Sequence, residues 1–214
     1  MNKASAQSVI HFFLQGGFFM VPLVICSVVS VAVMLMRGFA LRRKNVMPPL
    51  IETEIEELQP SDNADSVAKL TRLVRHDPSA LARIVLAGLQ HLQWTKTENV
   101  EAVQTRARHE IVRLESGLVV LEIIVGIAPL LGLVGTIIGM MTLFNNIGAA
   151  GLSDAARLAN GIGLILKTTL IGLLIAIPAL IAWSYFSKKV EVLAVEMEAL
   201  CDDFIRRQYG GEKN

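Results

Sequence analysis

The residues of this chain that could do chemistry are a few hydroxyl and charged side chains inside long apolar runs. Thr136 lies in one run, while Thr168 and Thr169 lie in another, directly after Lys167. Glu122 stands at the entry of the run that contains Thr136. A membrane threonine commonly bonds its own i−4 carbonyl. Hydroxyls on two adjacent helices could instead line a polar path, and both interpretations stay open.

Other chemistries find no support in the pattern. The segment 161–168 ends in Lys167-Thr168 like a phosphate-binding loop, but Leu166 occupies the place of the required glycine and no strand precedes it. There is no nucleophile elbow. The histidines give no metal pair at helical spacing; they are His11, His76, His91 and His109. We therefore predict no enzyme, no metal and no cofactor.

The composition points to a membrane protein. Of the 214 residues, 53% are hydrophobic and only 18% are charged, below the roughly 25% of soluble domains. The apolar residues gather in the runs 17–36, 123–144 and 161–186, and about 20 such residues cross the hydrocarbon layer as a helix. The first run is longer than a signal peptide core, and basic residues follow it. We predict an all-α polytopic protein with three transmembrane helices.

Basic residues beside the runs set the expected orientation, because cytoplasmic flanks are enriched in Lys and Arg. The flanks on one side carry most of them: Arg37, Arg42, Arg43, Lys44, Arg106, Arg108, Arg113, Lys188 and Lys189. The other side has only Lys3 and Arg157. We expect the N-terminus to lie outside the cytoplasm and the C-terminus inside it. The formal net charge of +1 gives no reason to expect nucleic acid as a partner, whereas membrane lipids are implied.

These patterns divide the chain into seven segments. They are an outer N-terminal segment at 1–15, transmembrane helices at 16–37, 117–145 and 160–186, a cytoplasmic helical region at 38–116, a periplasmic loop at 146–159 and a cytoplasmic C-terminal helix at 187–214.

The cytoplasmic part should be helical. Asp77-Pro78 favours a helix start, with Asp77 as N-cap and Pro78 at the first helical position. Two apolar stripes follow the helical period: Val100, Val103, Ala107, Ile111, Leu114 and Leu118, then Val190, Leu193, Met197, Leu200 and Phe204. We expect a continuous helix from about Asn99 to Asn145 and a similar extension of the third span, so that two helices reach far into the cytoplasm. Each stripe could pack within its own subunit or in an oligomer's cytoplasmic bundle.

Small residues and prolines mark the second and third spans. Gly135 and Gly139 form a GxxxG pair, and Gly132 adds a further small position. Such residues let membrane helices approach closely, either within one subunit or between subunits. Pro129 and Pro178 are expected to kink or loosen their helices.

The second-span sequence carries a specific resemblance. Ala128-Pro129-Leu130-Leu131-Gly132-Leu133-Val134-Gly135-Thr136, followed by Ile137-Ile138-Gly139-Met140, resembles the signature of the ExbB/TolQ proton-channel family, related more distantly to MotA. The segments 158–162, 168–169, 172–173 and 176–180 resemble that family's third span. The resemblance covers about residues 10–208 and is closer to ExbB than to TolQ.

That resemblance implies a function. Family members form a pentamer in the bacterial inner membrane, so the resemblance implies a periplasmic N-terminus and a cytoplasmic C-terminus. The second and third spans of each subunit line a central pore. The pore encloses the single-span helix of an ExbD or TolR partner, which carries an aspartate. Proton flow is thought to turn the pentamer and energise TonB-dependent uptake or Tol–Pal function through a TonB or TolA-like protein. By position, Thr136 and Thr169 match the family's pore threonines.

The sequence departs from the family at two positions. A glutamate is usual where Leu164 stands, and an apolar residue is usual at Lys167. Lys167 lies about 9 Å inside its span and about 60° around the helix from Leu164. Its stem either snorkels to the outer interface or faces the pore, where it would meet a partner carboxylate or gate the outer end. Glu122 is either an interfacial carboxylate or a proton acceptor in a cytoplasmic vestibule.

Three functions therefore compete. The first is a stator that converts proton-motive force into motion, with Thr136, Thr168, Thr169, Lys167, Leu164 and Glu122 lining its path. The second is a non-conducting scaffold of the same architecture, suggested by Leu164. The third is a membrane enzyme, which lacks a recognisable catalytic constellation.

Overall fold

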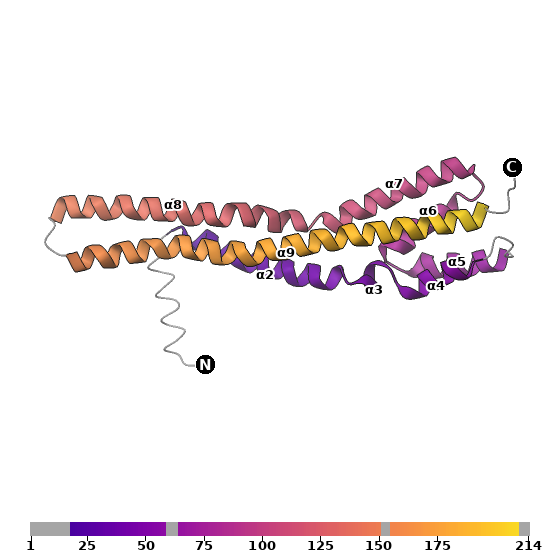
Figure 1. Ribbon diagram of the computed structural model, residues 1–214, viewed down its shortest axis with the longest axis horizontal. Coiled ribbons are helices and arrows are strands. Elements are labelled where there is room, and N and C mark those ends of the chain that lie inside the picture. Colours follow the sequence, from indigo (N-terminus) through magenta and orange to yellow (C-terminus); the bar gives the residue numbers. More distant parts are fainter. Residues whose placement is uncertain (1–17, 59–63, 151–154, 210–214) are drawn as a thin grey trace, which may run out of the picture. The chain divides into compact units, whose positions relative to one another are not determined.

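The computed structural model describes residues 18–58, 64–150 and 155–209, and all secondary structure in these residues is helical (Figure 1). The helices are α2 (Met20–Ala40), α3 (Arg43–Val46), α4 (Pro49–Glu57), α5 (Ala64–His76), α6 (Ala80–Gln90), α7 (Lys96–Glu115), α8 (Leu118–Ala150) and α9 (Ala155–Tyr209). The predicted all-α class is confirmed. The chain divides into two compact units, one with residues 1–35 and 118–184 and the other with residues 36–117 and 185–214.

Three stretches of helix among the described residues are long and apolar enough to cross a membrane: Met20–Ala40, Lys96–Asn145 and Gly161–Tyr209. Their outward faces are strongly apolar. Leu130 and Met141 of α8 are about 60% exposed, as are Leu174 and Ile181 of α9. Exposed apolar side chains over many consecutive turns belong in lipid or against other membrane helices. The predicted number of three membrane-spanning helices is thereby confirmed in the described part of the chain.

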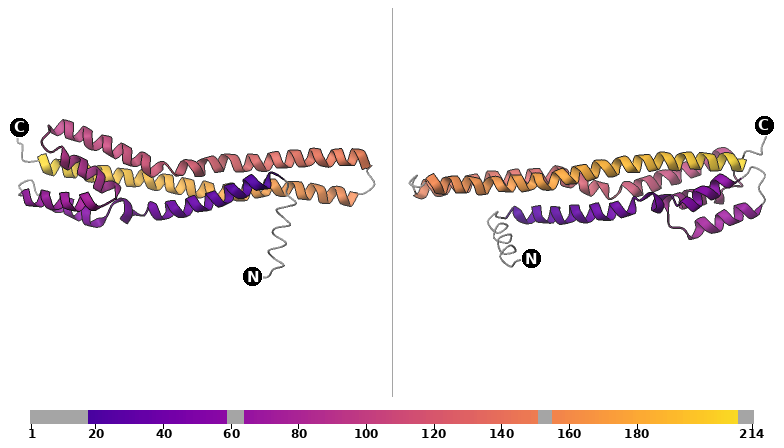
Figure 2. Two further views of the ribbon diagram at one scale, coloured as in Figure 1. Left: turned by 180° about the vertical axis from the view of Figure 1, so that it is seen from behind. Right: turned by 60° about the horizontal axis from the view of Figure 1, so that its bottom comes forward.

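The first unit is a layer of α2, α8 and α9 held together by small and branched side chains. α8 and α9 run side by side in opposite directions (Figures 1 and 2). Its buried cluster combines residues from all three helices, namely Met20, Leu23, Ile124, Ala128, Ala176 and Ala179. The alanines on α8 and α9 leave little space between the backbones.

The second unit contains α3 to α7 and the ends of α2 and α9 that belong to residues 36–117 and 185–214. Val103 of α7 and Leu193, Met197 and Phe204 of α9 lie in its core. Val100, Ala107, Ile111, Leu114 and Leu200 pack against that core. Both predicted apolar stripes are confirmed as packing surfaces within the subunit. The polar side of the α9 stripe is exposed, as its period requires.

The predicted N-cap at Asp77 is wrong, because α6 begins two residues later than expected. Ser79 is the N-cap, and its hydroxyl accepts a hydrogen bond from the Ala82 N–H at 3.2 Å. Asp77 supports this cap, since its Oδ1 accepts the Ser79 N–H at 2.8 Å. Ser79 was overlooked because the Asp-Pro pair gave the stronger local signal.

The helix expected from Asn99 to Asn145 comes as α7 and α8, separated by a turn at Ser116 and Gly117. Arg37 donates to the Leu114 carbonyl at 3.4 Å and to the Ser116 hydroxyl at 3.5 Å. A Cβ on Gly117 would collide with the Arg37 guanidinium. The turn therefore forms where a cation binds the open carbonyl end of α7 and a glycine leaves room for it.

The segment 146–159 is largely helical, because α8 continues to Ala150 and α9 begins at Ala155. Its residues 151–154 and the predicted outer segment 1–15 lie outside the described residues. The α7 helix starts at Lys96, with Thr95 and Glu98 forming a capping box that the sequence analysis had not identified.

Cys201 of α9 provides a test of the second unit's core. Burial, together with the negative charges of Asp202 and Glu198, raises the pKa of Cys201 to about 12. Because the thiolate is the reactive form, the folded protein should react with a maleimide at pH 8 about 10³-fold more slowly than the denatured chain. Mass spectrometry of a Cys26→Ala variant measures this. Equal rates before and after denaturation would contradict the buried position of Cys201.

Candidate functional site

The three threonines that the sequence singled out come together between α8 and α9 in the first unit. The Thr136 hydroxyl lies 3.3 Å from the Thr168 hydroxyl and is in hydrogen-bonding contact with the Thr169 hydroxyl. Thr168 is only 3% exposed, whereas Thr136 and Thr169 are half-buried. Two adjacent helices thus contribute a small polar cluster to an otherwise apolar layer.

The Gly132 carbonyl is the common acceptor of this cluster. It lies 3.0 Å from the Thr136 hydroxyl, 3.4 Å from that of Thr168 and 3.2 Å from that of Thr169. Thr136 reaches it within its own helix, and Thr168 likewise bonds the Ile165 carbonyl of its own helix at 2.7 Å. The interpretation that a membrane threonine bonds a carbonyl of its own helix therefore holds for Thr136 and Thr168. Thr169 instead bonds across the helix pair, so the cluster also joins α8 to α9.

Glycines allow the two backbones to come this close. A Cβ on Gly132 would lie 2.8 Å from the Thr168 carbonyl oxygen and 2.9 Å from the Thr169 Cα. One on Gly139 would lie 2.8 Å from a side-chain carbon of Ile165. One on Gly135 would be within 3.3 Å of Thr168. The small residues of the GxxxG pattern thus serve packing within the subunit, the plainer of the two interpretations.

Gly172 completes this contact, and the sequence analysis had not recognised its packing role. A Cβ there would lie 2.5 Å from the Ala128 carbonyl oxygen. The spacing of small residues could have indicated this contact in the sequence. Gly172, Ala176 and Ala179 follow one another at intervals of four and three residues, and all three are buried. The Ile165 carbonyl was also missed, because no side-chain type identifies a backbone acceptor.

Both prolines lie inside helices. Pro129 is within α8 and Pro178 is within α9, and neither ends its helix. A proline within a helix removes one backbone N–H, which leaves a carbonyl one turn earlier for another donor. Pro129 directly follows Ala128, whose carbonyl faces Gly172.

The two charged candidates, Lys167 and Glu122, are both exposed. Lys167 is exposed on α9, in sequence next to the buried Thr168. Glu122 is exposed on α8, about four turns before Thr136. Leu164 is part of α9, but its side chain lies outside the described residues.

The cluster can do two things chemically. Each threonine hydroxyl is both donor and acceptor, so neighbouring hydroxyls can pass a hydrogen-bond network from one helix to the next. They also satisfy carbonyls that would otherwise be costly in a low-dielectric layer. No group of three or more His, Cys, Asp or Glu side chains suited to a metal occurs in the described residues.

Comparison with known proteins assigns the family. The model of the MotA/TolQ/ExbB proton channel family matches residues 76–199, which include α8 and the threonine cluster. The chain belongs to the MotA/TolQ/ExbB proton channel family. It is therefore a multi-pass membrane transport protein and not an enzyme.

Individual relatives are of the ExbB type. A protein of Synechocystis sp. named "Putative biopolymer transport protein ExbB-like 1" is 33% identical over 80% of this chain and 67% of its own length. The "Biopolymer transport protein exbB1" of Vibrio cholerae is 34% identical over 77% of this chain and 73% of its own. A further Synechocystis protein, "ExbB-like 3", is 28% identical over 81% of this chain and 82% of its own. The resemblance recognised in the second span is thus confirmed over most of the chain.

The glycine contact gives a matched pair of variants on one helix. Gly132→Ala should separate α8 from α9, because its methyl group would meet backbone atoms that cannot rotate away. We expect a loss of about 1–3 kcal/mol, as for other overpacked sites, seen as a lower Tm of the detergent-solubilised protein. Gly126→Ala is the control, since nothing lies within 4 Å of a Cβ there. Equal Tm values for the two variants would contradict the close approach.

Proposed function

We propose that this chain is the stator subunit of an inner-membrane machine that uses proton-motive force to drive biopolymer transport. The proposal is supported by membership of a proton channel family and by relatives whose names refer to biopolymer transport. The observation that links the proposal to particular residues is the cluster of Thr136, Thr168 and Thr169 where α8 contacts α9.

In this proposal several copies, five by analogy with the family, surround one membrane helix of an ExbD or TolR-type partner. α8 and α9 face inward, so that the half-buried hydroxyls of Thr136 and Thr169 border the enclosed helix. A TonB or TolA-like protein receives the motion. The N-terminus lies in the periplasm and the C-terminus in the cytoplasm, because basic residues concentrate beside the inner ends of the spans.

The energy available is sufficient in size. Moving one charge across 100 mV releases about 2.3 kcal/mol, which exceeds the roughly 0.6 kcal/mol net value of a typical hydrogen bond between membrane helices. A proton that exchanges with groups beside the threonine cluster can therefore drive a rearrangement of such bonds. The α8–α9 hydroxyls are the polar groups that the structure places at this contact.

A second candidate function is a scaffold of the same architecture that conducts no protons. Leu164 favours it, because the family's usual glutamate at this position is replaced by an apolar residue. Proton flux into liposomes that contain the chain and its single-span partner separates the two functions.

Removing the hydroxyls tests the stator proposal. Thr136→Val and Thr169→Val keep the branched shape and lose the hydrogen-bonding oxygen. We therefore expect proton flux to fall about a hundredfold, the lower end of what a proton-transfer group contributes. Thr142→Val is the matched control, because the exposed Thr142 hydroxyl bonds the Ile138 carbonyl of its own helix, at 2.9 Å. Copurification of the partner should persist in all three variants. Unchanged flux in the first two would remove the threonines from the path.

Lys167 gives a test specific to this chain. We propose that its ammonium group, exposed on α9, meets a carboxylate of the partner helix or gates the outer end of the path. Ionisable residues inside spans usually serve such functions. Lys167→Met should therefore reduce partner copurification or proton-driven transport, whereas Lys167→Arg should retain both. If Lys167→Met has no effect on either measurement, the lysine only extends to the membrane surface.

A further inference from the structure

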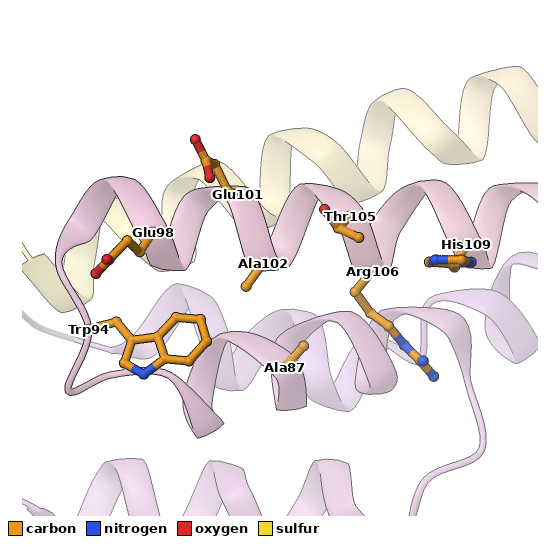
Figure 3. Close-up of a pocket in the computed structure, with 8 residues that line it drawn as sticks. All are labelled: Ala87, Trp94, Glu98, Glu101, Ala102, Thr105, Arg106 and His109. Carbon is orange, nitrogen blue, oxygen red and sulfur yellow. The ribbon is translucent and has the colours of Figure 1, made fainter.

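A surface pocket of about 570 Å³ lies between α6 and α7 in the second unit, and its lining combines an indole with charged groups (Figure 3). Ala87 and Ala102 face each other across it, and their small side chains leave the space open. Trp94 closes one end and is 49% exposed although it lies outside the apolar spans. An exposed indole beside a hollow is a common anchor point for a partner side chain.

The Trp94 end of this pocket is acidic. Glu98 and Glu101 line it, and both are exposed. Hydrogen bonds from the Thr95 hydroxyl and backbone N–H hold the pKa of Glu98 below its usual range, so its carboxylate is ionised at neutral pH. An indole face flanked by carboxylates fits a guanidinium group, which stacks on the ring and pairs with the acids.

The other end of the pocket is basic and defines the polarity of the site. His109 and Arg106 lie away from Trp94 (Figure 3). Arg106 forms an ion pair at 2.9 Å with Glu110, which is only 3% exposed and also pairs with Arg83 at 2.6 Å. The pocket is therefore complementary to a cation at its Trp94 end and not along its whole length.

A surface with the complementary charge exists on the same chain. Arg72, Arg75 and His76 are exposed on α5 and border a shallow hollow of about 450 Å³. Within the second unit α6 packs against α7 and also against α5. The acidic pocket and the basic face therefore belong to different helices that both flank α6, and one copy can present both surfaces to different neighbours.

We propose that the occupant of the Trp94 pocket is the α5 basic face of a second copy of this chain, with Arg75 stacked on Trp94 and near Glu101. Such a contact joins two different surfaces, so it is head-to-tail, and it forms a ring where the rotation between successive copies closes. It rests on the proposed homo-oligomer, and it adds a contact between neighbouring copies through their second units. The Trp94 end supplies aromatic area and negative charge, and α5 supplies the matching guanidinium groups.

Crosslinking of the full chain in membranes, with its partner coexpressed, tests the contact. In a Cys26→Ala, Cys201→Ala background, Arg75→Cys and Glu101→Cys are introduced together and treated with a short bismaleimide. We expect a ladder of crosslinked multiples, because each copy offers one cysteine to each neighbour. Either substitution alone should give no dimer, since a head-to-tail contact does not place identical residues together.

The remaining outcomes are separable. Arg75→Cys combined with Glu198→Cys, an exposed acid on α9, is the matched control and should give no ladder. Dimers from one single substitution would overturn the head-to-tail arrangement. Absence of a ladder while native mass spectrometry shows an intact oligomer would overturn this interface and leave the proposed oligomer standing. A monomer in native mass spectrometry would overturn both.

Charge reversal gives a second measurement without cysteines. Glu101→Arg should lower the fraction of assembled protein after dilution in detergent by about fivefold, the upper range for a surface ion pair. Arg75→Glu added to it should restore assembly, whereas Arg75→Glu alone should weaken it. A double variant no better than either single variant would overturn the pairing.

Discussion

The close approach of α8 and α9 is the constraint on which the first unit depends. In a low-dielectric layer every backbone N–H and carbonyl needs a hydrogen-bond partner from the protein itself. The Gly132 carbonyl is an example. Three threonine hydroxyls converge on it because Gly132 and Gly172 carry no side chain that would hold the backbones apart. The close packing of α8 against α9 and the clustering of the threonine hydroxyls therefore depend on each other. A change that separates the helices also disperses the hydroxyls.

The same helix that carries Thr168 and Thr169 is held at its far end by side chains of the second unit. Tyr209 accepts a hydrogen bond from the buried Asn99 amide at 3.0 Å, and its hydroxyl lies 3.1 Å from the Trp94 carbonyl. Arg207 donates to the Leu58 carbonyl at 3.0 Å. These bonds resist rotation of the last turns of α9 about its axis. Force applied to α9 therefore meets side-chain hydrogen bonds at its end as well as apolar packing.

Features that depend on helical periodicity or on residue type could be predicted from the sequence. The apolar stripes of α7 and α9 were assigned correctly because heptad-like spacing is visible without tertiary information. The N-cap was misplaced from Ser79 to Asp77, since two good capping residues compete within three positions. The turn at Gly117 could not be foreseen, because it depends on Arg37, far away in sequence. The hydrogen bond from Thr169 to the Gly132 carbonyl could not be predicted either. Helical spacing shows which residues share a face of a helix, but it does not show which helix packs against that face.

Because residue 164 is a leucine and not an acid, few side chains in the second and third spans could bind a proton. Between Ile123 and Phe186 the only Asp, Glu, Lys or Arg residues in the sequence are Asp154, Arg157 and Lys167. Asp154 and Arg157 belong to the segment that joins the two spans, so Lys167 is the charged side chain within them. A threonine hydroxyl can relay a proton but does not store one at neutral pH. Glu122, at the entry of the second span, lies about four turns from Thr136. If the chain conducts, a carboxylate that holds the proton beside the threonines must therefore come from another chain. The threonines and Lys167 then act by positioning that carboxylate and setting its proton affinity, because a nearby ammonium group favours its charged form.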